Sequence, residues 1–335
     1  MSLLPKKLLS LGADQDVENV MEQYPMRISK YYLSRIKEKD DPIWKQCVPD
    51  KKELEVNIAC RDPLKEREHS PVVSLVHRYR DRALLLVTSG CATYCRFCTR
   101  KRNISDKAWQ ITDEQLEQAI AYLRENTNIR DVVISGGDPL TLPIERLEQV
   151  LKRIYSIGHV KMIRIGTRLP CVDPDRVTPS LTQMLKKYHP LYMNVHFNHP
   201  DEITEKTEEC CNLLCDAGIP LGNQSVLLKG VNDSVDVMEE LVAKLIQLRV
   251  RPYYLYIPDL VKGTEHFRTP IKTGLSIIDQ LQTRISHMAI PRLMIDLPNG
   301  GGKTPLSSNH IVSQDGRQYH LKNYEGKDFI FNDVA

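Results

Sequence analysis

From Arg82 onward, short apolar runs of the kind that form β-strands alternate with longer stretches that have helical periodicity. The strand candidates are Ala83–Thr88, Asp131–Ser135, Met162–Gly166, Tyr192–His196, Leu221–Leu227 and Tyr253–Tyr256. The helix candidates are Asp113–Glu125, Pro143–Ser156, Ser180–Tyr188, Ile203–Ala217, Ser234–Leu248 and Thr273–His287. Repeated strand–helix units produce a parallel sheet covered by helices. Because no dinucleotide-binding glycine fingerprint accompanies the six units, the sequence predicts an α/β fold of the partial (β/α)6 barrel type.

The barrel pattern divides the chain into three predicted regions. Residues 1–80 read as an N-terminal helical extension, with helical spacing at Met21–Lys37 and Lys51–Cys60. Residues 81–290 contain the barrel, and residues 291–335 form a short C-terminal segment. Within that segment, His310–Phe331 alternates like a small β-hairpin around Asp315 and Gly316. Apolar residues make up 41% of the chain, which is enough for a sizeable core.

Composition excludes several classes of partner. The net charge is only +3, from 46 basic and 43 acidic side chains, so we expect neither a nucleic acid nor an anionic membrane as partner. No run is long and apolar enough to span a bilayer, and the first apolar stretch is too short for a signal peptide. An odd count of nine cysteines without a secretory signal indicates reduced thiols, which makes the cytoplasm the expected location.

Polar residues follow the predicted strands at the points where those strands end. In parallel barrels the chemistry lies at the carboxyl ends of the strands, so residues placed there are expected to meet. The six residues in question are Cys91, Asp138, Arg168, His196, Gln224 and Asp259, one for each predicted strand. Their agreement predicts an active site at this end of the barrel.

The most specific of these signals is the C-x3-C-x2-C spacing of Cys91, Cys95 and Cys98. Three close thiolates can bind three irons of a [4Fe–4S] cube and leave the fourth iron open to a small molecule. Zinc is the alternative, but structural zinc usually has four protein ligands, and ferredoxin clusters also use a fourth cysteine. The spacing therefore favours an open iron–sulfur cluster. Cys211 and Cys215 share a helix face, where buried structural thiols are the preferred interpretation over a second metal pair.

Two glycine-rich segments complete the pattern. Gly136, Gly137 and Asp138 directly follow a strand, and in isolation they indicate a turn with an Asp helix cap. Three glycines precede Lys303 in Asn-Gly-Gly-Gly-Lys-Thr-Pro, and in isolation they indicate a flexible turn with a solvated lysine. The functional interpretation of Lys303 is a Schiff-base lysine for pyridoxal 5′-phosphate (PLP), with small residues leaving room for the cofactor.

The cluster loop, with Phe97 before its third cysteine, resembles the signature of radical S-adenosylmethionine (SAM) enzymes. Together with the two glycine segments it resembles the lysine 2,3-aminomutase family, whose members are PLP-dependent. The likeness extends over nearly the whole chain and includes the stretches His77–Arg82, Phe197–Pro200, Pro220–Leu228, Arg249–Tyr254 and Glu265–Pro270. It implies three cofactors, namely a [4Fe–4S] cluster on the three cysteines, SAM and PLP.

The resemblance also implies roles for single residues. Lys303 would hold PLP, and Arg78 and Arg82 would serve its phosphate or ring oxygen, although ordinary surface ion pairs are the alternative for both arginines. The residues implied beside SAM are Gly136, Gly137 and Asp138, whose backbone receives the SAM amine, together with His196 and Gln224.

For the substrate, the resemblance implies that Arg100 binds the α-carboxylate and that Asp259 and Asp296 hold the remote ammonium of lysine. Two aspartates would repel the side chain of glutamate, and related glutamate enzymes carry a lysine and an asparagine there. The implied reaction moves the α-amino group of L-lysine to the β-carbon through a 5′-deoxyadenosyl radical and a PLP aldimine. Arginine as substrate, and a lysine mutase that serves β-lysylation of elongation factor P, remain alternatives.

The implied partners are a free amino acid and a reducing electron donor of the flavodoxin or ferredoxin type, and a homo-oligomer is compatible with the family. Longer members bind structural zinc across subunits through cysteines that this sequence lacks after Cys215, so no such zinc is expected. Two other classes remain open. A plain iron–sulfur electron carrier would leave Lys303 unexplained, and a PLP enzyme with a structural metal would not need Cys95.

Overall fold

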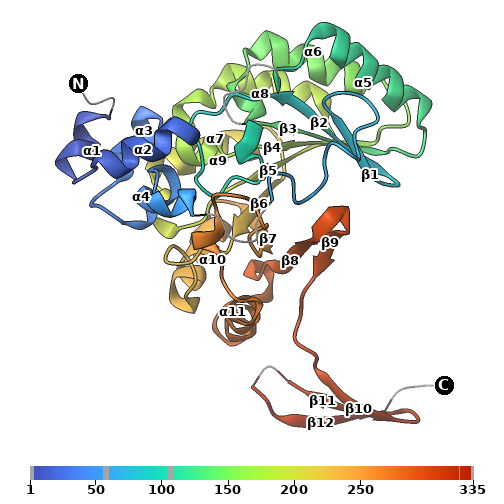
Figure 1. Ribbon diagram of the computed structural model, residues 1–335. Helices are drawn as coiled ribbons and strands as arrows, with labels where there is room; N and C mark the ends of the chain where they lie inside the picture. The colour runs from blue at the N-terminus through green and yellow to red at the C-terminus, as the bar shows by residue number, and fades with distance from the viewer. Residues whose placement is uncertain (1–3, 56–59, 104–108, 324, 333–335) are drawn as a thin grey trace.

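A single sheet of nine strands forms the body of the protein in the computed structural model, which describes residues 4–55, 60–103, 109–323 and 325–332 (Figure 1). Its strands follow chain order, and β2 to β8 are parallel, whereas β1 and β9 pair antiparallel at the two edges. The strands are β1 Leu75–Tyr79, β2 Arg82–Thr88, β3 Asp131–Gly136, β4 Met162–Gly166, β5 Leu191–Val195, β6 Leu221–Val226, β7 Val250–Tyr256, β8 Arg292–Leu297 and β9 Gly302–Pro305. The predicted α/β barrel is confirmed, and its sheet is nearly closed.

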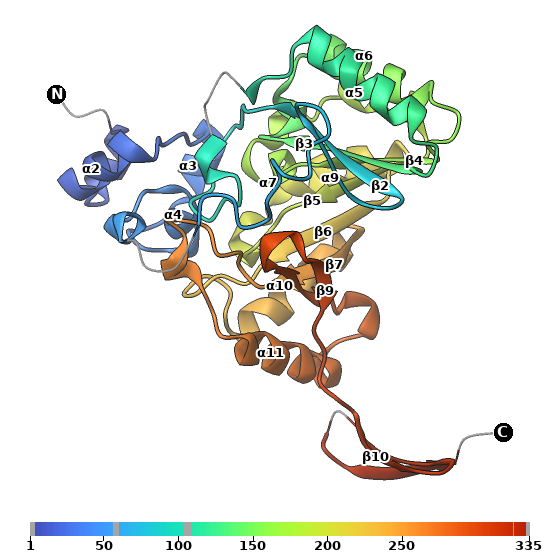
Figure 2. The same cartoon turned by 45° about the vertical axis from the view of Figure 1, so that its right-hand side comes forward.

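Helices cover the outer face of this sheet (Figures 1 and 2). They are α5 Asp113–Glu125, α6 Ile144–Tyr155, α7 Leu169–Val172, α8 Pro179–Leu185, α9 Glu205–Asp216, α10 Val235–Gln247 and α11 Ile271–Arg284. Helix α5 begins where the sequence predicts, because Thr112 and Gln115 form a reciprocal capping box. Helix α6 buries Leu147, Val150, Leu151 and Ile154, the spacing of one apolar face packed on a sheet.

The strands show the two-residue alternation that separates the core from the barrel interior. On β3, Val132 and Ile134 are buried in the apolar core, while Val133 and Ser135 line an interior cavity. On β4, Ile163 and Ile165 are likewise buried, and Arg164 between them lines the cavity. Successive side chains on a strand point to opposite faces, so one face packs on helices and the other can carry polar groups.

Four short helices form the N-terminal part and lie at one side of the barrel (Figure 1). They are α1 Lys6–Ser10, α2 Gln15–Gln23, α3 Lys30–Arg35 and α4 Pro42–Cys47. The expectation of one helical stretch over Met21–Lys37 is wrong, because α2 ends at Gln23 and Pro25, which has no N–H and disfavours helix before it, precedes α3. Of the stretch Lys51–Cys60, Lys51–Leu54 is a single 3-10 turn, Glu55 and Cys60 are not helical, and residues 56–59 lie outside the described residues.

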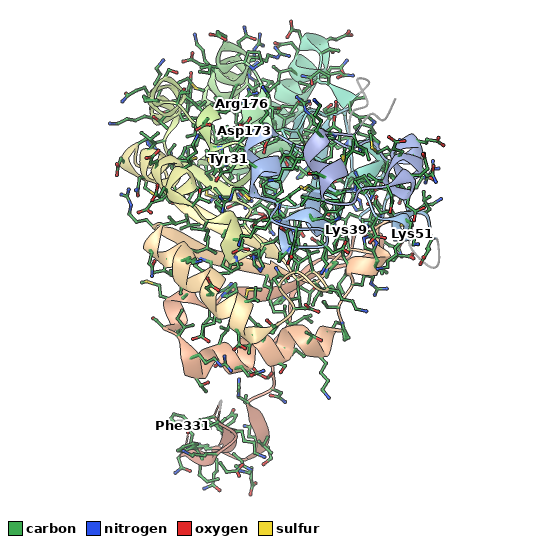
Figure 3. The ribbon with its side chains drawn as sticks, turned by 90° about the vertical axis from the view of Figure 1, so that its left-hand side faces the viewer. Tyr31, Lys39, Lys51, Asp173, Arg176 and Phe331 are labelled. Atoms are coloured by element: carbon green, nitrogen blue, oxygen red, sulfur yellow. The ribbon has the colours of Figure 1, made fainter. Side chains whose placement is uncertain are left out.

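A second, three-stranded antiparallel sheet projects from the body (Figures 1 and 2). Its strands are β10 Ile311–Asp315, β11 Gln318–Lys322 and β12 Asp328–Asn332. The predicted hairpin around Asp315 and Gly316 is confirmed, and β12 adds a third strand to it. Phe331, labelled in Figure 3, lies on this sheet away from the body and is exposed. The predicted boundaries at residues 80 and 290 stay predictions, and β8 and β9 belong to the barrel sheet.

Within the described part of the chain, no helix has the length and apolarity that crossing a bilayer requires.

Candidate active site

A cavity of about 440 Å³ lies inside the barrel. All fourteen residues that the sequence analysis singled out for cofactors and substrate line it. They are Arg78, Arg82, Cys91, Cys95, Cys98, Arg100, Gly136, Gly137, Asp138, His196, Gln224, Asp259, Asp296 and Lys303. The carboxyl ends of parallel strands meet at one end of a barrel, which explains how residues so far apart in sequence share one cavity.

The cluster loop, residues 91–98, is held in place by a buried ion pair that the sequence analysis did not find. The guanidinium of Arg96 pairs with Glu53, and its Nε donates to Glu53 Oε1 at 2.8 Å. Lys101 Nζ also donates to Glu53, at 2.6 Å, and both partners of Glu53 are buried with it. The N–H of Arg96 donates to the carbonyl of Gln46 at 2.9 Å. These bonds fix the loop against the N-terminal helices.

The three cysteines of the loop are half-buried free thiols. Burial raises the pKa of Cys91 well above its usual range and that of Cys98 to about 11, so a thiolate here needs a bound cation to compensate. Among the described residues, no three His, Cys, Asp or Glu side chains converge closely enough to hold one metal ion. A [4Fe–4S] cube makes no such demand, because each thiolate binds a different iron. The donor set therefore fits the cube better than it fits the zinc ion that the spacing left open.

Gly136 and Gly137 lock the end of β3 to the start of the cluster loop. A Cβ on Gly136 would lie 2.3 Å from the carbonyl oxygen of Thr88, and one on Gly137 would lie 2.3 Å from that of Gly90. The N–H of Gly137 donates to Thr88 O at 2.5 Å. Gly136 also has a φ of +133°, which L side chains rarely adopt. The close approach that requires glycine is thus to the protein's own backbone, in addition to any ligand.

The carboxylate of Asp138 is hydrogen-bonded to other groups of the protein. It accepts hydrogen bonds from Thr167 Oγ1 and from the N–H of Arg168, both at 2.7 Å. Burial raises the pKa of Asp138, and these donors oppose that effect. Asp138 therefore joins the end of β3 to the end of β4. This leaves the backbone of the segment, rather than the carboxylate, to contact a ligand.

His196 and Gln224 also line the cavity. The ring of His196 lies 5.5 Å from that of Phe97, and His196 Nε2 is 3.1 Å from Asn198 Oδ1. Burial lowers the pKa of His196 to about 3, and the charge of Arg168 adds to this, so the imidazole is neutral. Gln224 lies on β6 and lines the same cavity.

Lys303 lies on β9, directly opposite Asp296 on β8 in the antiparallel register. Lys303 Nζ is 2.5 Å from Asp296 Oδ2, and Arg78 Nη2 is 3.1 Å from Asp296 Oδ1. The N–H of Lys303 donates to Tyr79 Oη at 2.9 Å, and its Nζ lies 4.6 Å from the centre of the Tyr256 ring. Because Arg78 and Tyr79 belong to β1, these contacts join the two edges of the barrel sheet by side chains.

The turn before Lys303 needs glycine for its backbone as well. Gly300 and Gly302 have φ values of +79° and +95°, and a Cβ on Gly300 would lie 2.4 Å from His69 Cε1. These positive angles let β9 reverse onto β8 and carry Lys303 to Asp296.

Asp259 is the second acid of the predicted ammonium site. Its Oδ2 accepts a hydrogen bond from Thr99 Oγ1 at 2.9 Å. Burial raises the pKa of Asp259 to about 6, the charge of Asp296 raises it further, and the bond from Thr99 opposes this. A cation placed between the two carboxylates would stabilise the charged form of Asp259.

Arg100 and Arg82 have partners within the protein. Arg100 Nη2 and Nε lie 2.7 and 3.0 Å from Glu66 Oε1, so one edge of the predicted carboxylate-binding guanidinium is already used. Although burial alone would raise the pKa of Glu66, Arg100 and Arg102 hold it below its usual value. The side chain of Arg82 is 40% exposed, packs on the Tyr79 ring and lies 3.8 Å from Asp81, which suits the surface alternative for Arg82.

Comparisons with known proteins agree with this geometry. The model of the radical SAM superfamily matches residues 85–242, and the model described as lysine-2,3-aminomutase matches residues 278–332. The L-lysine 2,3-aminomutase of Clostridium subterminale is 48% identical over 96% of this chain and 78% of that protein. That of Methanococcus maripaludis is 49% identical over 93% of this chain and 73% of that protein. The chain belongs to the lysine 2,3-aminomutase family of radical SAM enzymes.

As a member of this family, the protein is an isomerase that uses a [4Fe–4S] cluster and SAM. Membership alone does not fix the amino acid, because the glutamate 2,3-aminomutase of Clostridioides difficile is 44% identical over 93% of this chain and 74% of that protein. The substrate must therefore be inferred from the side chains at the end of the cavity that contains Lys303, which we call the lysine end.

Several residues of this aminomutase's cavity escaped the sequence analysis. Glu66 comes from an irregular segment without periodicity, and nothing in its surroundings marks it as the partner of Arg100. Tyr79 could have been predicted from the sequence, because it adjoins Arg78 in a stretch that resembles the family. Tyr256 ends β7, so the strand-end argument that selected Asp259 applies to it equally.

Proposed function

We propose that this aminomutase moves the α-amino group of L-lysine to the β-carbon and releases β-lysine. Its cofactors would be a [4Fe–4S] cluster on Cys91, Cys95 and Cys98, SAM beside that cluster, and PLP on Lys303. The observation that carries the proposal is the shared cavity, because Lys303 and two carboxylates line the same space as the three cysteines. A radical enzyme needs this closeness, since positioning and the exclusion of water prevent side reactions.

Bound cluster and SAM would supply a carbon-centred radical that removes hydrogen, and bound PLP would supply a π-bond to the migrating nitrogen. The protein's own residues do the rest. Lys303 must lose a proton before its amine can bond the PLP aldehyde, and Asp296 at 2.5 Å is the acceptor next to it. Arg78, 3.1 Å from the same carboxylate, supplies a cation for the PLP phosphate or ring oxygen.

The choice of lysine follows from charge. Asp259 and Asp296 would hold the ε-ammonium, and the two carboxylates would repel the side chain of glutamate. Arg100, fixed on one edge by Glu66, would hold the α-carboxylate with its remaining donors. Arginine is the second candidate, because its guanidinium would satisfy the same two acids.

We further propose a free amino acid as the substrate, a flavodoxin- or ferredoxin-type electron donor and a cytoplasmic location. The elongation factor P pathway is the alternative destination of the product. A homo-oligomer remains compatible with the fold.

The test is anaerobic turnover by protein reconstituted with iron, sulfide, SAM, PLP and a reductant. We expect β-lysine from L-lysine, less product or none from arginine, and no product from glutamate. The variant Asp296→Asn should lose activity on lysine while keeping its iron content. If wild-type protein with a full cluster leaves lysine unchanged but converts glutamate, the assignment of the two acids is wrong.

A further inference from the structure

A buried arginine that no proposed step uses lies against one of the cluster cysteines. Arg168 lies two residues after the end of β4 at Gly166, and its side chain is 8% exposed. Its Nη1 lies 2.8 Å from Cys95 Sγ, within hydrogen-bonding distance of the sulfur. Arg96, although adjacent to Cys95 in sequence, pairs with Glu53 instead. Among the described residues, Arg168 is therefore the charged side chain that hydrogen-bonds a sulfur of the cluster loop.

The guanidinium is held rigidly from the side opposite the cysteine. Its Nη2 donates to Gln46 Oε1 at 2.6 Å, to Glu202 Oε1 at 2.8 Å and to Tyr32 Oη at 3.0 Å. Glu202 is held in turn by Tyr32 Oη at 2.6 Å and by backbone N–H groups. The guanidinium carbon also lies 5.2 Å from the Phe97 ring centre. These contacts come from α3, α4 and the 3-10 turn Pro200–Glu202, so the direction of the N–H toward sulfur is fixed by the fold.

We propose that Arg168 donates an N–H···S hydrogen bond to Cys95 of the assembled cluster and, with Glu202 as counter-charge, sets the cluster's reduction potential. The inference rests on the proposed cluster ligands. Hydrogen bonds to the sulfurs and local net charge are the main levers on the potential of an iron–sulfur cluster. A reduced cluster carries one more negative charge, so a fixed cation beside it stabilises the reduced form and makes the potential less negative. The effect is strong here because the pair is buried, where charges are poorly screened.

Glu202 acts in the opposite direction. Its carboxylate lies 2.8 Å from the same guanidinium and offsets part of the positive charge that the cluster experiences. With both residues present, the reduction potential should lie between two values. It would be less negative with Arg168 alone and more negative without Arg168. If the Arg168–Glu202 pair served only to pack the N-terminal helices on the barrel, removing either charge would leave the potential unchanged.

The experiment is an anaerobic redox titration of the reconstituted cluster without substrate, followed by electron paramagnetic resonance of the reduced form. Arg168→Gln should shift the midpoint potential to more negative values, and Glu202→Gln should shift it to less negative values. Arg146→Gln is the matched control, because Arg146 lies on α6, outside the cavity lining, and pairs with Asp113 rather than with a cysteine. Its cluster should titrate like that of the wild type.

The outcomes separate this inference from the proposed function. If wild-type protein holds no cluster, the proposed function itself fails. If the clusters of both Arg168→Gln and Glu202→Gln form and titrate like the wild type, the inference is overturned and the proposed function stands. If Arg168→Gln does not assemble a cluster, Glu202→Gln decides: a less negative potential supports the inference and an unchanged one overturns it.

Discussion

The two ends of the cavity are built in different ways. At the cluster end, charged groups are buried and satisfied by distant parts of the chain, as in the pair Arg96–Glu53, whose side chains are 2% and 0% exposed. At the lysine end, the side chain of Lys303 is 36% exposed, and it pairs with Asp296 across neighbouring strands at the edge of the sheet.

The contrast separates a preformed site from an exchangeable one. At the cluster end, the pair Arg96–Glu53 joins two protein groups that have no proposed ligand, so it persists whatever is bound. At the lysine end, Asp296 pairs with Lys303 and Arg78, and each of these three groups has a proposed ligand of its own. Binding of PLP and lysine would therefore replace those ion pairs. The predictions below try to break this separation, beginning with the largest expected effect.

Replacing Cys98 by alanine removes one of the three proposed iron ligands. We expect loss of the iron, of SAM cleavage and of all amino transfer, because the cluster end has no spare ligand in the proposed set. Iron analysis and anaerobic turnover would measure this. The matched control is Cys210→Ala, a buried thiol on α9 outside the cavity lining, which should retain iron and activity. Full activity in Cys98→Ala would refute the proposed ligands.

Replacing Lys303 by alanine should abolish amino transfer but leave the iron content and the reduced-cluster spectrum as in the wild type. The reason is that Lys303 belongs to the exchangeable end and has no bond to the cluster loop among its contacts in the described chain. Loss of PLP absorbance in the visible range, measured beside iron content, checks it. Loss of the cluster as well would show that the two ends are not independent.

Replacing Asp259 by asparagine should raise the KM for lysine by roughly 10- to 100-fold, since a hydrogen bond to a charged group contributes about 1.5–3 kcal/mol. We expect a smaller effect on kcat, because Asp259 would hold the remote end of the substrate. Steady-state kinetics with lysine would test this, and an unchanged KM would remove Asp259 from the site.

Replacing Gly137 by alanine tests the rigidity of the cluster end. A Cβ there would lie 2.3 Å from Gly90 O, so we expect a loss of about 1–3 kcal/mol of stability together with reduced iron loading. Gly158→Ala is the control, because a Cβ at Gly158 meets no atom within 4 Å. Thermal unfolding of both variants decides the matter. Equal melting temperatures would mean that the loop adjusts freely.

The smallest expected effect is a pH dependence of lysine binding. The pKa of Asp259 is raised to about 6, mainly by burial and then by Asp296, while Thr99 and Lys303 oppose the rise. Below pH 6 the carboxyl becomes neutral and attracts an ammonium less, so kcat/KM for lysine should fall as the pH drops through 6. In Asp259→Asn this step should be absent. A step of the same size in the variant would assign it to another group.

The sequence predicts the parts of the fold that periodicity dictates. Helix α5 and strand β4 occupy the predicted bounds Asp113–Glu125 and Met162–Gly166, because each has a clean pattern and well-marked ends. Strands β1, β8 and β9 lie outside the six predicted strands. In β9, Gly302, Lys303 and Pro305 are of types depleted in strands, so its residues showed little sign of the pairing with β8.

The site was predictable for a related reason. Residues at the ends of parallel strands converge whatever their distance in the sequence, so Cys91, His196 and Asp259 could be brought together from the pattern alone. Their partners could not. Glu66, which binds Arg100, and Glu202, which binds Arg168, come from segments without periodicity, and such pairings depend on the three-dimensional path of the chain.

The most direct test of the shared cavity uses L-lysine deuterated at its β-carbon. Wild-type protein with its cluster, SAM, PLP and a reductant is incubated without oxygen, and the 5′-deoxyadenosine recovered from SAM is examined by mass spectrometry. We predict that deuterium appears in the 5′-deoxyadenosine and that Lys303→Ala greatly reduces this transfer. Steady conversion of lysine to β-lysine without any deuterium in the nucleoside would contradict the account, because the radical would then not be acting on the amino acid held at the other end.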